Sequence, residues 1–304
     1  MANQTNKAQA IFEAHAHLAL TEHSVFQDAS EPFNDTYFET SVYHAAHQAC
    51  LSLGFIPTDA ACLAGAWQRM FIRTGQFDAG IWPSEPEDFG MPSWPRENAF
   101  LACPRKLGLY AVLPDAAWVK RMAQAGVPTV QLRFKSDDAQ AIEREVHAAV
   151  QAVKGTNALL FINDHWQAAI NAGAYGVHLG QEDLVEADLN QIRTAKLRLG
   201  LSSHGYAEMM RADAVSPSYI AMGAVYPTTL KRMTTAPQGA GRLSAYARLM
   251  RHYPLVAIGG IDQSKLPEVL ASGVGSVAVV RALVAAEHPE AVAASFQAVI
   301  NAAA

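Results

Sequence analysis

Two aspartates, Asp164 and Asp183, are the residues of this chain best suited to hold a metal ion. Each closely follows a short apolar run, with no cysteine and few well-placed histidines around it. Carboxylate oxygens without thiolate or imidazole partners favour Mg²⁺ over Zn²⁺. Mg²⁺ usually takes only one or two carboxylates and leaves its other positions to water and substrate phosphates. The pair therefore predicts a magnesium-assisted diphosphate site.

Basic residues and glycines occupy comparable positions. Arg133 and Lys135 end one apolar run and Lys231 follows another, so their positive charge could hold an anionic diphosphate. Gly259 and Gly260 end a later run, where backbone N–H groups bind phosphate in many barrels. The sequence thus predicts two phosphate-binding regions, one with a metal ion and one made of backbone.

Each of these residues also has an ordinary structural explanation when it is taken alone. An aspartate after a strand often caps the next helix, and Lys135 could be a solvated surface residue. Gly259 and Gly260 could form a simple tight turn. His178, in the middle of an apolar run, is expected to be a packed interior histidine rather than a ligand. The functional hypothesis depends on all these groups meeting at one face of the fold.

Eight apolar runs from Leu107 onward must position these groups. They alternate with helical patterns, which is typical of β/α units around a parallel sheet. The runs span 107–114, 129–134, 158–163, 176–180, 197–203, 219–226, 255–261 and 276–283. They predict an α/β fold, a (β/α)8 TIM barrel with its active site at the carboxyl ends of the strands. A doubly wound open sheet is the alternative, but no G-x-G-x-x-G motif follows the first run.

The chain before Leu107 does not share this pattern. Residues 1–75 carry apolar residues at helical spacing in three segments, the third opened by Pro57. Residues 76–106 contain five prolines, which cannot sit inside helices or central strands. We therefore expect an N-terminal helical extension (1–75), a proline-rich connector (76–106) and the barrel (107–304).

Composition excludes several classes of function. The formal net charge of -5 argues against a nucleic-acid or anionic-membrane surface. The three cysteines, Cys50, Cys62 and Cys103, fit neither a disulfide framework nor a zinc site and are expected to be small buried hydrophobic residues. The N-terminus lacks the pattern of a secretion signal, and no apolar stretch approaches the roughly 18 residues that span a membrane. We expect a cytoplasmic protein.

Six segments in order along the barrel carry a resemblance to a known family. They are VQLRFK, LFINDHWQAAI, GVHLGQEDL, YPTTLKRMTTAPQG, VAIGGI and VAVV. With this spacing the chain from about Leu107 to its end resembles thiamine-phosphate synthases. The signal is specific, because FIND followed by GVHLGQEDL is not generic barrel sequence.

The resemblance implies a transferase of thiamine biosynthesis that joins 4-amino-5-hydroxymethyl-2-methylpyrimidine diphosphate to 4-methyl-5-(2-phosphoethyl)thiazole. It implies that Mg²⁺ binds at Asp164 and Asp183, and that the partners are these small molecules rather than nucleic acid or membrane, with a homo-oligomer possible. The family's pyrimidine diphosphate site corresponds to Gln131, Leu132, Arg133, Phe134, Lys135, Asn163, Ser202 and Lys231. Arg133, Ser202 and Lys231 take the catalytic roles. The family's thiazole phosphate site corresponds to Thr228, Thr229, Leu230, Gly260, Val280 and Arg281.

Two positions depart from the family pattern. The family has Thr-x-Thr-Lys after the sixth strand, and Leu230 stands at the second threonine. The family usually has serine after the valine pair of the eighth strand, where this chain has Arg281. Both changes fall on the thiazole side, and the diphosphate side is intact.

Two other functions are open to such a chain. A thiazole tautomerase would need an acid–base residue such as His204 but no diphosphate site, so Lys231 and the aspartate pair argue against it. A non-catalytic binding module would be explained by Leu230 and Arg281.

The extension is expected to be a helical appendage that packs on the barrel or on a neighbouring subunit, and its removal is expected to spare the chemistry.

Overall fold

The computed structural model describes residues 2–20, 41–228 and 235–303. Eight parallel strands form a closed barrel in the order of the chain, and the first strand pairs with the last through Gly108 and Ser276. The strands are β1 (Gly108–Leu113), β2 (Thr129–Leu132), β3 (Leu159–Asn163), β4 (Gly176–Leu179), β5 (Arg198–Ser203), β6 (Tyr219–Met222), β7 (Leu255–Ile258) and β8 (Ser276–Val279). The prediction of a TIM barrel is confirmed.

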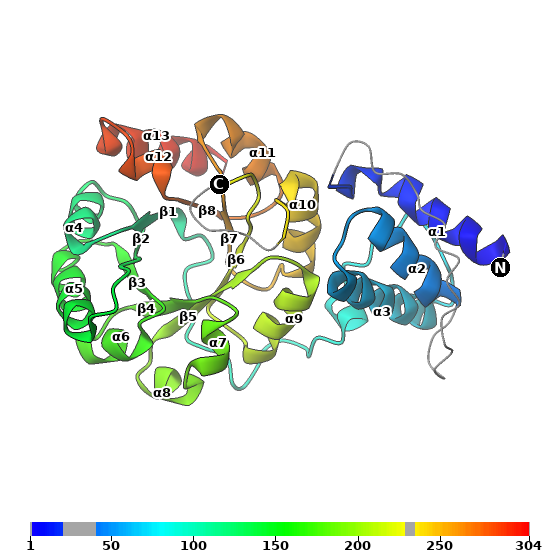
Figure 1. Cartoon of the computed structure of the whole chain (residues 1–304), viewed down its shortest axis with the longest axis horizontal. Helices are drawn as coiled ribbons and strands as arrows, with labels where there is room; N and C mark the ends of the chain where they lie inside the picture. Colours follow the sequence, from blue (N-terminus) through cyan, green and yellow to red (C-terminus); the bar gives the residue numbers. More distant parts are fainter. Residues whose placement is uncertain (1, 21–40, 229–234, 304) are drawn as a thin grey trace.

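Helices surround the barrel and cover the outer face of its strands (Figure 1). They are α4 (Ala116–Gln124), α5 (Ala139–Ala152), α6 (Trp166–Ala172), α7 (Asp183–Glu186), α8 (Leu189–Thr194), α9 (Tyr206–Val215), α10 (Gly239–Leu249), the 3-10 turn η3 (Gln263–Lys265), α11 (Leu266–Ala271), α12 (Arg281–Val284) and α13 (Pro289–Ala302). Arg281 was expected within the eighth strand, and this was wrong. The strand ends at Val279, and Arg281 is the first residue of α12.

Large side chains fill the inside of the barrel beneath its mouth. Tyr110, Phe161 and Tyr219 are almost completely buried there, and their rings meet edge to face at centroid distances of 5.0 to 6.0 Å. Two strand glycines make room for them. A Cβ on Gly176 would lie 2.5 Å from the Phe161 ring, and one on Gly200 would lie 2.1 Å from the Tyr219 ring. Small residues facing large ones let the interior reach native packing density.

The N-terminal extension forms a helical unit beside the barrel. Its helices are α1 (Ala2–Ala14), the 3-10 turn η1 (Ala16–Leu18), α2 (Ser41–Ser52) and α3 (Pro57–Thr74), and Figure 1 shows them next to α9 and α10. Buried apolar side chains such as Ile11, Leu63 and Trp67 hold the unit together. Pro57 opens α3 as expected, and Gly75 ends that helix in the left-handed conformation.

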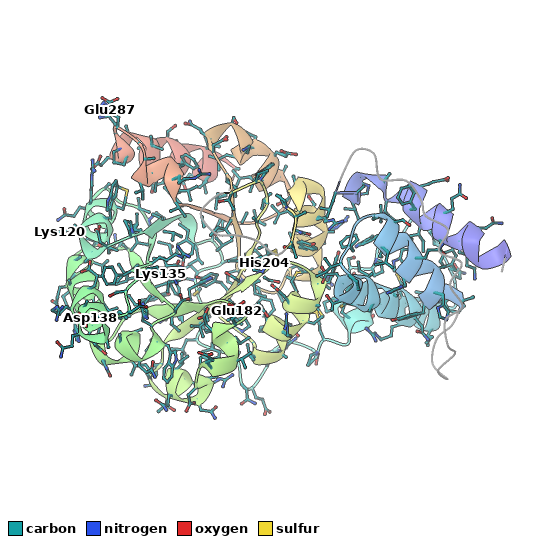
Figure 2. All side chains as sticks on the ribbon, viewed as in Figure 1. Lys120, Lys135, Asp138, Glu182, His204 and Glu287 are labelled. Atoms are coloured by element: carbon teal, nitrogen blue, oxygen red, sulfur yellow. The ribbon has the colours of Figure 1, made fainter. Side chains whose placement is uncertain are left out.

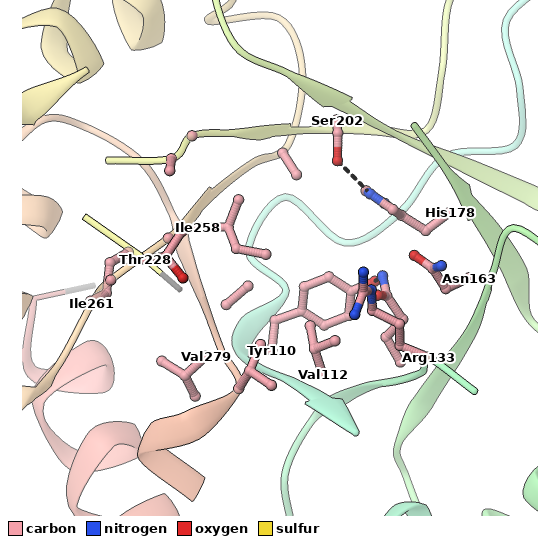
Figure 3. A pocket seen from close by; sticks show the side chains of 18 of the residues that line it. Tyr110, Val112, Arg133, Asn163, His178, Ser202, Thr228, Ile258, Ile261 and Val279 are labelled. Carbon is pink, nitrogen blue, oxygen red and sulfur yellow. Dashed lines mark hydrogen bonds between the residues drawn. The ribbon is translucent and has the colours of Figure 1, made fainter. Parts of the chain in front are cut away.

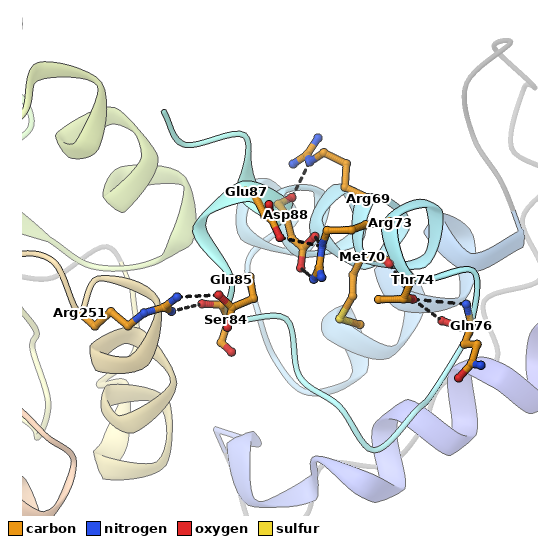
Figure 4. A network of polar contacts seen from close by, with 10 residues as sticks. All are labelled: Arg69, Met70, Arg73, Thr74, Gln76, Ser84, Glu85, Glu87, Asp88 and Arg251. Carbon is orange, nitrogen blue, oxygen red and sulfur yellow. Dashed lines mark hydrogen bonds and ion pairs between the residues drawn. The ribbon is translucent and has the colours of Figure 1, made fainter. Parts of the chain in front are cut away.

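Hydrogen bonds and ion pairs of the connector join this unit to the barrel. In its 3-10 turn η2 (Pro86–Phe89), Asp88 accepts two hydrogen bonds from Arg73 of α3. Just before that turn, Glu85 pairs with Arg251 of the barrel at 2.6 Å (Figure 4). Further along, Arg96 forms a buried ion pair with Asp213 at the end of α9, at 2.8 Å. Asp213 precedes β6, so this contact lies at the amino ends of the strands, opposite the mouth.

Among the described helices, none combines the length and apolar character needed to cross a bilayer. The cysteines carry no disulfide: Cys50 is buried, whereas Cys62 and Cys103 are half-buried.

Replacing Gly200 by alanine is expected to destabilise the barrel, because the added Cβ would collide with the Tyr219 ring. Overpacking a filled core costs about 1–3 kcal/mol. The control is Gly65→Ala in α3, where the Cβ would meet only the flexible end of Arg69 at 3.4 Å. That change should stabilise the chain by about 0.5–1 kcal/mol. Urea denaturation measures both effects, and a Gly200→Ala protein as stable as the unchanged chain would contradict this packing.

Candidate active site

A cavity of 740 Å³ opens at the carboxyl ends of the strands. Every strand of the barrel contributes at least one lining residue, because the carboxyl ends of parallel strands converge at one face. Figure 3 shows Arg133, Asn163 and His178 on one side of it, and Thr228 and Ile261 on the other. The two sides carry different groups, and each could bind a different part of a ligand.

The acidic pair lies on the β3–β4 side. Lys135 Nζ donates to Asp164 Oδ2 at 2.7 Å, and Asp183 Oδ2 accepts a hydrogen bond from the Gly180 N–H at 3.1 Å. Burial, followed by the negative charge of Asp164, raises the pKa of the Asp183 carboxyl. Asp164 has a φ of 62°, a left-handed conformation that aspartate tolerates better than most residues. Its N–H donates to His178 O, which fixes the turn that brings the carboxylate to the mouth.

Two neighbouring carboxylates that repel each other are suited to a divalent cation. In the described part of the chain, no group of three or more His, Cys, Asp or Glu side chains is arranged to hold a metal ion. The pair therefore fits an ion that needs few protein ligands and completes its shell with water and phosphate oxygens, as Mg²⁺ does. Asp164 and Asp183 are the residues that could hold it.

A chain of buried hydrogen bonds runs beneath the mouth. Ser202 Oγ bonds to His178 Nε2 at 2.8 Å, and His178 Nδ1 bonds to the Tyr219 hydroxyl at 2.7 Å. The Tyr219 and Tyr110 hydroxyls lie 2.6 Å apart, and Gln131 Nε2 donates to the Tyr110 hydroxyl at 2.9 Å. Burial raises the pKa of both tyrosines, so they stay neutral. The chain holds Ser202 and Gln131 in fixed orientations at the cavity wall.

Backbone forms much of the opposite side. Gly259 and Gly260 have positive φ values of 105° and 63°. A Cβ on Gly260 would lie 2.5 Å from Pro227 O, so only glycine allows this close approach of the two loops. Arg281 and Lys265 line the same side, and Lys265 Nζ donates to Gly260 O at 3.0 Å. An anion bound here would lie close to backbone N–H groups and to positively charged side chains.

The structure brings most of the residues predicted from the sequence to this cavity. Its lining includes Gln131, Arg133, Lys135, Asn163, Asp164, Asp183, Ser202, Thr228, Gly260, Val280 and Arg281. Leu132 and Phe134 do not line it, because side chains alternate along β2 and these two pack toward the surrounding helices. Thr229, Leu230 and Lys231 lie outside the described residues.

Sequence reasoning missed several lining residues. Tyr110 and Val112 stand two positions apart on β1 and both face the cavity, so the period of two along that strand could have found them. His178 is buried as expected, but it also lines the cavity. His204 lines the wall as well, and both its N–H and its Nδ1 bond to Glu208 Oε2. Figure 2 shows Lys135 and His204 projecting over the barrel, inside the ring of helices.

Known proteins resemble the barrel portion of this chain. A family model described as thiamine monophosphate synthase matches residues 109–283. The thiamine-phosphate synthase of Neisseria meningitidis serogroup A is 54% identical over 199 residues, which cover 66% of this chain and 97% of that protein. The thiamine-phosphate synthase of Salmonella paratyphi B is 50% identical over 195 residues, or 64% of this chain and 92% of that protein.

Solved structures agree with these matches. Thiamine phosphate pyrophosphorylase from Pyrococcus furiosus has a TM-score of 0.59 and 25% sequence identity, and the match covers 66% of this chain and 98% of that chain. The family model reaches from β1 into α12 and so includes the residues on both sides of the cavity. This chain belongs to the thiamine monophosphate synthase family.

Proposed function

We propose that the cavity at the barrel mouth is where 4-amino-5-hydroxymethyl-2-methylpyrimidine diphosphate is joined to 4-methyl-5-(2-phosphoethyl)thiazole. The bond between the pyrimidine methylene carbon and the diphosphate oxygen breaks, and its electron pair leaves with pyrophosphate. The lone pair of the thiazole nitrogen forms the new C–N bond, which gives thiamine phosphate. This nitrogen has no proton to lose, so the step needs no general base.

The distribution of charge in the cavity is the observation that carries this proposal. Arg133, Lys135 and the carboxylates of Asp164 and Asp183 lie on one side, and glycine backbone with Arg281 and the Lys265–Asp262 ion pair lies on the other. Between them the wall is apolar or aromatic, with Tyr110, Val112, Ile258 and Val279. A diphosphate at one end, a phosphate at the other and two heterocycles between them match this order of groups.

Arg133 and Lys135 are assigned to the diphosphate, with Lys231 as the third positive group. Their role is to stabilise the charge that develops on the departing pyrophosphate. Gln131, Asn163 and Ser202 line the wall below and are assigned to the pyrimidine ring. The buried chain of hydrogen bonds keeps Gln131 and Ser202 in place before the substrate arrives, which lowers the cost of ordering them on binding.

Mg²⁺ is the ion that we assign to Asp164 and Asp183. When bound there, it would supply Lewis-acid stabilisation of negative charge on the diphosphate oxygens. Lys135 neutralises part of the charge of Asp164 through its 2.7 Å contact. It also places its own ammonium group next to the position assigned to the leaving group.

The thiazole phosphate is assigned to Gly260, Val280 and Arg281, together with Thr228 to Leu230. Arg281 is the first residue of α12 and lines the cavity. A guanidinium group can form two parallel hydrogen bonds to a phosphate, which the serine typical of the family cannot. We propose that Arg281 compensates for the hydroxyl that is lost at Leu230.

We also propose that the chain divides into the extension (1–75), the connector (76–106) and the barrel (107–304). The unpaired cysteines and the absence, among the described residues, of a helix that could cross a membrane support a cytoplasmic enzyme.

Purified protein with both substrates and Mg²⁺ should release pyrophosphate and form thiamine phosphate in equal amounts. Asp183→Asn should lower kcat/KM by roughly 100-fold or more at limiting Mg²⁺, because charge stabilisation by a metal ion contributes several kcal/mol. Glu186→Gln is the matched control. It changes an exposed carboxylate on the same short helix that does not line the cavity. Equal activity of the two variants, or no product from the unchanged protein at high concentration, would refute the assignment.

Arg281→Ser should raise the KM for the thiazole phosphate by about 10- to 100-fold, since a hydrogen bond to a charged group contributes about 1.5–3 kcal/mol. The KM for the pyrimidine diphosphate should change far less. Steady-state kinetics with each substrate varied in turn gives both constants. The thiazole alcohol, which lacks the phosphate, serves as the control ligand and should bind both proteins alike. An equal effect on both substrates would place Arg281 outside the thiazole site.

A further inference from the structure

We propose that the helical extension is a positioning element of the active site. Through Asp59 it holds the turn after β5, and through Arg242 it holds Gln238 and Ala224, which belong to the described residues between β6 and α10. The inference rests on the proposed function, because Ser203, His204 and Ala224 beside these contacts line the cavity. It also departs from the expectation that the extension can be removed without effect on the chemistry.

Arg242 of α10 is the centre of this contact. Its side chain is buried, with only 2% of the residue exposed. Nε donates to Leu18 O at 2.9 Å and Nη2 donates to Leu53 O at 2.8 Å, so two carbonyls of the extension bind one barrel arginine. The guanidinium carbon lies 3.6 Å from the ring centre of Phe55, which is also in the extension. A buried charge with this many partners fixes the extension against α10.

The same guanidinium reaches the end of the β6–α10 loop. Arg242 Nη1 donates to Gln238 Oε1 at 3.1 Å, and the Tyr246 hydroxyl donates to the same oxygen at 2.9 Å. The Gln238 N–H in turn donates to Ala224 O at 2.9 Å. Ala224 lines the cavity together with Thr228. One short series of contacts therefore leads from the extension to the cavity wall.

Asp59 of α3 makes the second contact, at the loop after β5. It is buried, and its Oδ1 accepts a hydrogen bond from the Ala207 N–H at 2.8 Å. Ala207 lies in the first turn of α9, and the residue at the capping position, Gly205, has no side chain to do this. A Cβ on Gly205 would lie 2.0 Å from Asp59 Oδ2, so the carboxylate takes the space of a capping side chain. Ser203 and His204, which line the cavity, directly precede this turn.

These contacts lie at the mouth, whereas Arg96 of the connector pairs with Asp213 at the opposite end of the barrel. The strands close into a barrel without any residue of the extension. The contacts of Asp59 and Arg242 therefore fix the starts of α9 and α10 rather than completing the sheet. Because small displacements of positioning groups can cost about 100-fold in rate, a loop that is held in place from outside the barrel affects catalysis.

Two buried arginines allow a matched test in the full-length protein. Arg242→Gln loosens the extension at the mouth, and Arg96→Gln loosens the connector at the amino ends of the strands, where Arg96 pairs with Asp213 at 2.8 Å. Both variants should melt at a lower temperature than the unchanged protein. Only Arg242→Gln should raise the KM for the thiazole phosphate, by about 10-fold or more, with a fall in kcat. The constants are measured well below the melting temperature, on protein shown to be folded by circular dichroism.

Gln238→Met provides a second measurement that leaves the extension untouched. It removes the acceptor shared by Arg242 and Tyr246, so it should reproduce the increase in KM, and it decides the matter if Arg242→Gln does not fold. Unchanged KM values in Arg242→Gln and Gln238→Met, or equal changes in Arg96→Gln, would overturn the inference. Turnover by the unchanged protein is measured first. A failure of the proposed function appears there, and a failure of this inference appears only in the comparison of variants.

Discussion

The repulsion between two carboxylates at the barrel mouth is the constraint on which the rest of the site depends. Asp164 directly follows β3, and Asp183 begins α7 after the neighbouring strand β4. Burial, and then the negative charge of Asp164, raises the pKa of Asp183. The ion pair of Asp164 with Lys135 offsets only part of this negative charge. A divalent cation would neutralise the remaining negative charge of the two carboxylates and would itself bind a diphosphate. The positive side chains nearby would then stabilise the departing pyrophosphate.

Hydrogen bonds inside the barrel orient polar side chains of the site, and the extension contacts the helices next to it. Glycines at 176 and 200 let three large rings fill the interior, and the tyrosine hydroxyls among them join the hydrogen-bond chain that orients Gln131 and Ser202. The extension contacts the first turns of α9 and α10, the helices that follow β5 and β6. Arg281, one of the two departures from the family pattern, also lines the cavity.

Local patterns in the sequence were enough to predict the barrel and most of the cavity lining. Strand runs bounded by polar residues place Asn163, Asp164 and Ser202 at the mouth whatever the details of packing, because parallel strands end at one face. The position of Arg281 could not be predicted in the same way, since an apolar run continues past the point where β8 ends and α12 begins. The contacts of Arg242 with Leu18 and Leu53 join residues 224 and 189 positions apart, and no spacing rule relates such residues.

Binding of Mn²⁺, used as a probe for Mg²⁺, tests the central claim most directly. Titration followed by electron paramagnetic resonance would count the ions bound by the full-length protein, with and without inorganic pyrophosphate. The account predicts that pyrophosphate tightens Mn²⁺ binding to the unchanged protein, and that replacing both aspartates by asparagine abolishes this effect while the fold is kept. Equal binding by the unchanged and the doubly substituted protein would contradict a metal–diphosphate site at Asp164 and Asp183.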